Sequence, residues 1–187
     1  DRRRRECDGQ PAAAPRGLSL VFAPDPALWD GRYANNGWLQ ELPKPLTKQT
    51  WGNAALLAPD TAAALGVRDG DEVEIASGAR RVVGPACIVA GHAPDTVTLT
   101  LGYGRTGAGR LAEGVGFDAY ALRTTASRWL AETVVITPTG KRRPVITTQM
   151  HHAMEGRDIV RVVATESPEP VEPATERPSL YPDWPSE

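Results

Sequence analysis

The apolar residues of this chain come in short runs that glycine and proline interrupt, and this spacing limits the folds open to it. Residues 72–76 and 96–101 alternate polar and apolar side chains, as half-buried strands do. Residues 18–22 and 54–57 are short apolar runs with a proline two residues beyond, a length typical of buried strands. No apolar run approaches the roughly 18 residues of a membrane span. The patterns predict a mainly β fold with no membrane-crossing segment in this chain.

Local turn and cap signals add detail to this prediction. Residues 59–66, PDTAAALG, predict a compact helix with polar residues near its start and Gly66 as its stop. Asp69-Gly70-Asp71 predicts a turn, and Ser77-Gly78 predicts a hairpin. Further strands are predicted over residues 80–83, 133–137 and 145–148. Many short strands with one small helix predict a closed β-barrel.

The chain divides into three parts. Residues 1–17 are rich in Arg, Ala and Pro without periodicity, and we expect a flexible arm there. Residues 18–163 form the expected folded domain. Residues 164–187 are expected to be a disordered Pro/Glu-rich linker, because six prolines and six acidic residues leave too few apolar groups for a core. The chain begins with Asp1, not Met, which we interpret as a piece of a longer polypeptide.

Composition argues against several classes of function. A formal net charge of -2 argues against nucleic acid as a partner. The two cysteines, Cys7 and Cys87, are fewer than the thiolates that a cysteine-held iron–sulfur cluster needs. Cys87 lies in the apolar run ACIVA and is expected to be a buried core residue. No Gly-x-Ser-x-Gly elbow and no Gly-Ser dipeptide occurs, so neither serine catalysis nor self-processing at such a bond is predicted.

A metal site is not predicted either. His151 and His152 are adjacent, and neighbouring side chains rarely ligate one metal together because they point in different directions. His92 is the only other histidine. One of the pair is expected to pack against the barrel and the other to face a cleft or partner.

The strongest signal for binding is the stretch LGYGRTGAGRLAEGVGFDAYALR at residues 101–123, which contains six glycines and three arginines. Glycines allow a close approach of the backbone to a ligand or partner, and arginines supply donors for anions. Glycine is also common in turns between strands, so these glycines are open to two interpretations, a binding loop or a set of turns. Asn35-Asn36-Gly37 likewise suits either an amide-rich binding turn or a plain strand-end turn, with Trp38 and Trp51 as core aromatics.

The order of these segments resembles a known family. A Trp-Leu-x-Glu-Leu-Pro segment, a short strand, a helix ending in Leu-Gly-Val, an Asp-Gly-Asp turn and strands leading to the Gly-rich loop resemble the C-terminal dinucleotide-binding-type domain of the molybdopterin oxidoreductases. More narrowly, NNGWLQELPKPLTKQTW, LGYGRTGAGR, GVGFDAYALR and TQMHHAMEGRDIVR are similar to the molybdopterin-oxidoreductase-like iron–sulfur subunit of bacterial alternative complex III, a quinol:electron-acceptor oxidoreductase. The resemblance runs from about residue 18 to residue 161 and implies a double-psi β-barrel.

The resemblance also implies a cofactor region. Relatives bind molybdopterin guanine dinucleotide, and the matching residues here are Asn35, Asn36, Gly102, Gly104, Arg105, Gly114, Gly116 and Asp118. Relatives that bind the cofactor often carry asparagines where this chain has Asp118 and Tyr120. Because a carboxylate repels phosphate, this departure favours a barrel without the molybdenum cofactor. Iron–sulfur clusters would lie in an adjoining region, so we expect no cofactor, metal or catalysis in the isolated chain.

We therefore expect a non-catalytic barrel that supports an iron–sulfur module. Its implied partners are other domains or subunits of a membrane-associated complex on the periplasmic side of a bacterial inner membrane. The loop of residues 102–118 should then face protein, with Arg105 or Arg110 paired to carboxylates. One alternative is a working dinucleotide-binding domain of a molybdenum oxidoreductase. Another is a stand-alone barrel that binds peptides or proteins.

Overall fold

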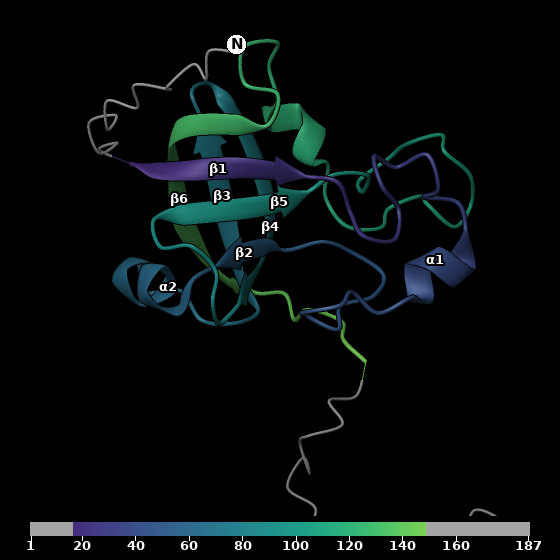
Figure 1. Cartoon of the computed structure of the whole chain (residues 1–187), viewed down its shortest axis with the longest axis horizontal. Coiled ribbons are helices and arrows are strands. Elements are labelled where there is room, and N and C mark those ends of the chain that lie inside the picture. Colours follow the sequence, from purple (N-terminus) through teal and green to yellow (C-terminus); the bar gives the residue numbers. More distant parts are fainter. Residues whose placement is uncertain (1–16, 149–187) are drawn as a thin grey trace, which may run out of the picture. The chain divides into compact units, whose positions relative to one another are not determined.

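The computed structural model describes residues 17–148, which form a closed six-stranded barrel with strand order β1-β5-β2-β4-β3-β6 (Figure 1). The strands are β1 Leu18–Ala23, β2 Ala55–Leu57, β3 Asp71–Ser77, β4 Arg80–Ile88, β5 Thr96–Thr100 and β6 Leu130–Arg142. The helical segments are α1 Gly37–Glu41, α2 Pro59–Leu65 and the 3-10 helix η1 Ala119–Leu122. Residues 1–16 of the arm expected at residues 1–17, the linker expected at residues 164–187 and both His151 and His152 lie outside the described residues.

Two parallel strand pairs define the topology. β1 pairs with β5 and β2 pairs with β4 in parallel, while the other neighbours are antiparallel. The hairpin predicted at Ser77-Gly78 is present, with Ser77 opposite Arg80 in the β3–β4 ladder. This arrangement confirms the predicted double-psi β-barrel.

The barrel core follows from the alternation in the sequence. In β3, Val73 and Ile75 are fully buried, while Glu72 and Glu74 are half-exposed on the other face. Cys87 is buried in β4, as predicted. Gly84 is required in the same strand, because a Cβ atom there would collide with the ring of Phe117. The core is thus filled by residues from both the strands and the Gly-rich region.

The helix predicted from PDTAAALG is α2. Pro59 opens it, Asp60 lies in its first turn, and Gly66 ends it in the left-handed conformation with φ of 66°. The residue before it, Ala58, makes no side-chain cap bond, so the proline and the glycine set its limits. None of the helices within residues 17–148 is long and apolar enough to cross a membrane.

Two strand predictions need correction. The strand predicted at residues 133–137 is part of the much longer β6, which changes register against β1 near Thr133, a residue with φ of 63°. Residues 145–148 do not form a strand, and Thr147 makes only an isolated bridge to Gln49. Pro144, which has no N–H to donate, separates these residues from the end of β6.

Residues 24–53 and 101–118 lie together at one end of the barrel, and we call them the loop lobe (Figure 1, right). The lobe has a small apolar cluster of its own, formed by Leu28, Ala34, Tyr103 and Ala112. It also contains α1, a short helix that the sequence patterns did not predict. All eight predicted binding residues belong to this lobe.

Candidate functional site

The Gly-rich loop begins by packing against the backbone of the loop lobe. A Cβ atom on Gly102 would lie 2.8 Å from the backbone nitrogen of Gly31, and one on Gly31 would lie 2.8 Å from the Gly102 Cα atom. Both residues also have positive φ, at 104° and 98°. Glycine is needed here because two chain segments touch each other, which is a packing role.

The later glycines of the loop divide into two kinds. A Cβ atom on Gly104 would collide with the backbone of Phe117 and Asp118, and one on Gly116 would lie 2.5 Å from Asn53 Oδ1. Gly114, with φ of 72°, instead faces open space. Of the predicted glycines, only Gly114 therefore has open space where a side chain would stand.

The predicted amides and carboxylate hold local structure. Asn35 Oδ1 accepts from the Leu111 N–H at 3.0 Å and so joins the two halves of the lobe. Asn36 caps α1, because its Oδ1 accepts from the Leu39 N–H at 3.3 Å. Asp118 caps η1 by accepting from the Tyr120 N–H at 2.8 Å. Asn36 and Asp118 therefore serve as helix caps, and Asn35 serves as a link between two chain segments.

Tyr120 fixes the position of η1 against the lobe. Its hydroxyl donates to the backbone carbonyl of Asp30 at 2.9 Å, and partial burial raises its pKa. Asp30 in turn pairs with Arg32 at 2.8 Å on the surface, and this hydrogen-bonded pairing lowers the pKa of the Asp30 carboxyl. Tyr120 therefore acts as a tie between chain segments in this structure.

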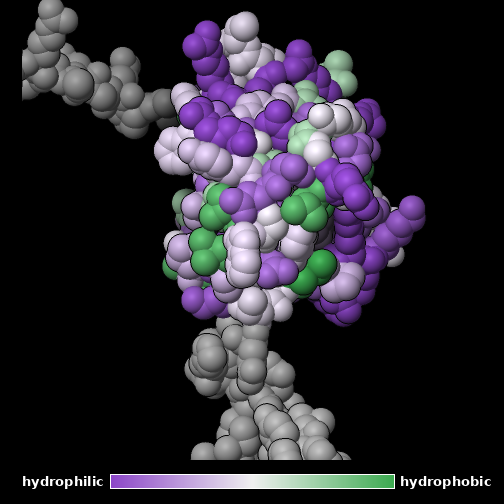
Figure 2. Space-filling model, turned by 90° about the vertical axis from the view of Figure 1, so that its right-hand side faces the viewer, coloured by the Kyte–Doolittle hydropathy of each residue, from purple (hydrophilic) through white to green (hydrophobic). Residues whose placement is uncertain are grey.

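Arg105 and Arg110 are both exposed on the loop. Within residues 17–148 neither forms an ion pair with a carboxylate, so the pairing expected for them is not found in this part of the chain. Figure 2 looks onto this end of the molecule and shows mostly hydrophilic residues with separate apolar groups among them. The two guanidinium groups are available to an anion or to an acidic partner.

A buried ionic cluster that the sequence did not predict lies behind the loop. Lys44 Nζ donates to the Gly52 carbonyl at 2.8 Å and to the Tyr103 hydroxyl at 2.9 Å. It also lies 3.3 Å from Asp25 Oδ2, an ion pair without hydrogen-bond geometry. The Asp25 side chain is fully buried, and that of Lys44 is 9% exposed. The other Asp25 oxygen accepts from the N–H groups of Ala27 and Leu28.

Burial shifts the ionisation of this cluster. Burial lowers the pKa of Lys44, and the nearby Asp25 carboxylate opposes that shift. Burial and the same carboxylate raise the pKa of Tyr103 far above its usual range. Because Lys44 Nζ is surrounded by Gly52, Tyr103 and Asp25, its protons are used internally and no face is left for attack on a substrate. We assign the cluster a structural role.

A second buried polar residue, Asn53, ties the loop to the barrel. Its Nδ2 donates to the carbonyls of Thr100 and Phe117 at 3.1 and 3.0 Å, and its Oδ1 accepts from the Phe117 N–H at 2.9 Å. Asn53 thus joins the end of β5 to the end of the Gly-rich loop. A lone asparagine in a sequence gives no signal of this long-range role.

The arrangement can be compared with what a bound dinucleotide would need. Asn35, Asn36 and Asp118 have internal partners, and Gly102, Gly104 and Gly116 are enclosed by protein. Arg105, Arg110 and the backbone at Gly114 remain open. As arranged, the Asp118 carboxylate and the side-chain oxygens of Asn35 and Asn36 serve contacts within the protein, and only part of the predicted set is left for a pyrophosphate. Within residues 17–148, no group of three or more His, Cys, Asp or Glu side chains is placed to hold a metal ion.

Comparisons with known proteins bear on the domain type. No curated protein sequence matches this chain. Among solved structures, acetylene hydratase from Pelobacter acetylenicus is similar, with 14% sequence identity and a TM-score of 0.49, over 65% of this chain and 18% of that chain. This chain therefore spans about a fifth of that protein's length. The model of the family described as "Molydopterin dinucleotide binding domain" matches residues 30–154, well over half of the chain. The chain belongs to the molybdopterin dinucleotide-binding domain family.

Proposed function

We propose that this chain is the barrel domain of a molybdopterin-oxidoreductase-like subunit of the alternative complex III type, where it acts as structural support. Membership of the family supports the domain type. The resemblance of the segments around Trp38, the Gly-rich loop and residues 148–161 supports the narrower assignment.

One observation carries the supporting role: most of the side chains and glycines that would meet a dinucleotide have partners within the protein, with Arg105 and Gly114 as the exceptions. The Asp118 carboxylate caps η1 beside the closed contact of Gly104 with the Phe117–Asp118 backbone. A negative charge at this position opposes a pyrophosphate, and the side-chain oxygens of Asn35 and Asn36 are used by the Leu111 and Leu39 N–H groups.

The proposed partners follow from this assignment. Other domains or subunits of a membrane-associated electron-transfer complex would contact the barrel, on the periplasmic side of a bacterial inner membrane. The iron–sulfur clusters that carry electrons would belong to an adjoining region. The exposed Arg105 and Arg110 would then meet acidic groups of a neighbouring domain.

A second candidate is a working dinucleotide-binding domain of a molybdenum-dependent oxidoreductase. The same two arginines favour it, since neither has a carboxylate partner within the described residues and the backbone at Gly114 is open. Guanidinium groups are well suited to phosphate. In this case Arg105 and Arg110 would hold the pyrophosphate, and Asn36 and Asp118 would still cap their helices.

Calorimetric titration of the full chain separates the two candidates. The probes are GDP, which is the nucleotide part of the cofactor, and the complete pterin guanine dinucleotide. We expect no saturable heat with either probe up to about 1 mM, and none with Asp118→Asn, because Tyr120 and the closed glycines remain. Binding at micromolar levels, about -8 kcal/mol, that Arg105→Ala with Arg110→Ala abolishes would instead support the second candidate.

Purification from detergent-solubilised membranes of the source cells tests the complex itself. An antibody against the barrel should recover an assembly with the spectra of iron–sulfur clusters and c-type haem and with quinol oxidation activity. Stoichiometric molybdenum in that assembly, measured by elemental analysis, would contradict a support role without the cofactor. Recovery of the chain free of redox partners would contradict the assignment to such a complex.

A further inference from the structure

The Arg123 side chain lies among three aromatic rings at the point where η1 ends. Its guanidinium carbon is 4.9 Å from the centre of the Trp129 ring, 5.2 Å from that of Tyr120 and 5.9 Å from that of Phe22. All three distances are within the limit of about 6 Å for cation–π contacts. The rings hold the guanidinium in place, and a side chain held in this way loses little conformational freedom when it binds a partner.

The hydrogen-bond donors of Arg123 are only partly used. The residue is partly exposed, and its Nε donates to the Arg128 carbonyl at 2.7 Å. Its two terminal nitrogens make no hydrogen bond within residues 17–148, and Arg123 forms no ion pair there. The two terminal nitrogens of a guanidinium match the two oxygens of a carboxylate. Arg123 is therefore arranged to accept a carboxylate from outside this domain.

Further arginines lie beside this position. Arg80 donates through Nη1 to the carbonyls of Ala121 and Arg123, which brings a second guanidinium to the end of η1. Arg128 is exposed in the segment that leads to β6. Neither arginine pairs with a carboxylate within residues 17–148. The carboxylate of Asp118, before the start of η1, accepts a backbone N–H of that helix. The arginines outnumber this carboxylate, which favours an anionic partner.

Trp129 adds an apolar contact to this charge. It is 56% exposed, although its ring also contacts the Arg123 guanidinium. Tryptophan, tyrosine and arginine are the residue types that most often dominate the binding energy of protein interfaces. A small inorganic anion would use the arginines and leave the ring uncovered, and the net charge of -2 argues against nucleic acid. Charge and ring together favour a polypeptide that carries an acidic and an apolar side chain close together.

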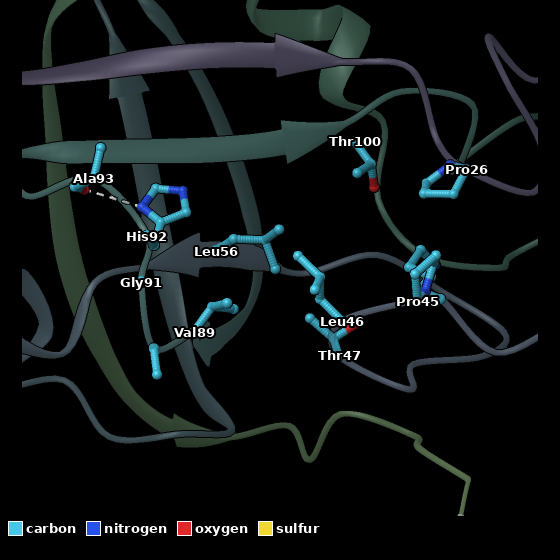
Figure 3. A pocket seen from close by; sticks show the side chains of 12 residues that line it. Pro26, Pro45, Leu46, Thr47, Leu56, Val89, Gly91, His92, Ala93 and Thr100 are labelled. Carbon is cyan, nitrogen blue, oxygen red and sulfur yellow. Dashed lines mark hydrogen bonds between the residues drawn. The ribbon is translucent and has the colours of Figure 1, made fainter.

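The cavity on the barrel wall offers a contrast (Figure 3). It has a volume of about 480 Å³ and lies between β2 and the loops of residues 44–47 and 89–93. Its lining is mainly apolar, and its two charged or titratable side chains, Lys44 and His92, both have hydrogen-bond partners within the described residues. Such a lining does not select one occupant over another, whereas the unpaired charge at Arg123 does.

We propose that Arg80, Tyr120, Arg123, Arg128 and Trp129, here called the Arg123 surface, form an interface for an acidic polypeptide segment. A carboxylate of the segment accepts two hydrogen bonds from the terminal nitrogens of Arg123, and a neighbouring apolar side chain packs on Trp129. The inference rests on the proposed function only in taking a polypeptide as the partner. None of the eight binding residues predicted from the sequence belongs to this surface.

The test is calorimetric titration of the full chain with acidic peptides at about 20 mM salt, where exposed charges are little screened. The probe has the sequence EEEFEEE with blocked ends, while EEEAEEE lacks its apolar side chain and QQQFQQQ lacks its charges. We expect saturable binding of EEEFEEE, weaker binding of EEEAEEE and none of QQQFQQQ. Arg123→Gln should weaken EEEFEEE about ten-fold, because a charge-assisted pair is lost. Arg68→Gln, the matched control, makes the same change of charge at the opposite end of β3 from Arg80 and should bind normally.

Two more variants test the geometry of the contact. Arg123→Lys keeps the charge but loses the planar fork, so it should bind EEEFEEE nearly as weakly as Arg123→Gln does. Trp129→Ala should bind EEEFEEE and EEEAEEE equally, because the ring that distinguishes them is gone. Amide chemical shifts of each variant check that the barrel is intact.

The proposal is overturned if EEEFEEE does not saturate below about 1 mM, or if Arg68→Gln weakens its binding as much as Arg123→Gln does. Wild-type binding in Arg123→Lys would overturn the carboxylate contact through two hydrogen bonds. Preferential binding of phosphatidylserine vesicles or of a single-stranded DNA oligonucleotide, lost in Arg123→Gln, would overturn the choice of a polypeptide. A failed peptide titration would leave the proposed function standing, because the GDP titration and the purification of the complex test that separately.

Discussion

Lys44 connects several segments of the loop lobe through its buried ammonium group. The ammonium contacts the Gly52 carbonyl, the Tyr103 hydroxyl and the Asp25 carboxylate, which belong to three separate segments. A buried ion pair need not add net stability, because both charges lose their hydration. Removal of only one of the two charges is costly, however, since the remaining charge stays buried without a partner.

Lys44→Met should therefore lower the free energy of unfolding by about 3 to 5 kcal/mol, measured by urea denaturation of the full chain. The matched control is the double variant Lys44→Met with Asp25→Asn. It removes both charges but keeps the Oδ1 acceptor for the N–H groups of Ala27 and Leu28. We expect it to recover most of the loss. A double variant as unstable as the single one would mean that the bonds to Gly52 and Tyr103 matter more than the charge.

Tyr103 gives a prediction about alkaline pH. Burial and Asp25 raise its pKa in the folded state, whereas an unfolded tyrosine ionises near pH 10. Above about pH 10 the unfolded state therefore binds fewer protons than the folded state, and stability falls as pH rises. In native protein at pH 11, wild type and Tyr103→Phe should show the same tyrosinate absorbance. After denaturation, wild type should gain one more tyrosinate than the variant. A difference in the native state would show that Tyr103 ionises while folded.

At the scale of elements, the Gly-rich loop is held by backbone contacts that no other residue type permits. Gly104 and Gly107 have nearly identical φ angles of 66° and 67°. A Cβ atom on Gly104 would collide with the backbone of Phe117 and Asp118, whereas one on Gly107 meets nothing within 4 Å. The two positions therefore separate backbone strain from steric exclusion.

Gly107→Ala should cost about 1 to 2 kcal/mol of stability, from the left-handed conformation alone. Gly104→Ala carries the same strain and must also move the Phe117–Asp118 backbone away, so its cost should be at least about 2 kcal/mol larger. Thermal and urea unfolding of both variants measure the difference. Equal costs would indicate that the loop yields at Gly104 and that the close contact is not needed for the fold.

The elements that the sequence predicted well are those whose signals are local. The alternation in residues 72–76 and 96–101 and the stop at Gly66 appear in the structure as β3, β5 and α2. α1 has only five residues, too few for a helical period to stand out. The strand predicted at residues 145–148 is wrong. This segment has no neighbouring strand and makes only a single bridge, from Thr147 to Gln49, and no local pattern reveals that.

The candidate site was harder to predict for the same reason. Glycine density predicted a close approach of the backbone to a ligand or partner. Whether a glycine meets a ligand or another segment of its own chain depends on distant contacts such as that of Gly102 with Gly31. Lys44 and Tyr103 are 59 positions apart. Their pairing depends on the barrel closing, and a lysine between two prolines carries no sign of it.

At the scale of the whole described domain, there are two separate apolar clusters. The large one fills the barrel, and the small one around Leu28 and Tyr103 supports the loop lobe. Asn53 joins the end of β5 to the end of the Gly-rich loop, because its amide contacts the carbonyls of Thr100 and Phe117 as well as the Phe117 N–H. Small clusters open more readily than large ones, so the lobe should be the region that opens first.

Asn53→Ala should loosen the lobe before the barrel, because it leaves buried backbone groups without partners at a cost of about 1 to 3 kcal/mol. Amide hydrogen exchange measures this residue by residue. Exchange at the Gly104 N–H, bonded to Val115, should rise about ten- to a hundred-fold, while exchange at Val73 and Ile75 in β3 should stay near the wild-type rate. Asn35→Ala, which removes one exposed hydrogen bond from the Leu111 N–H, is the control and should change exchange only near Leu111. A uniform rise across lobe and barrel in Asn53→Ala would show that they unfold as one cooperative unit.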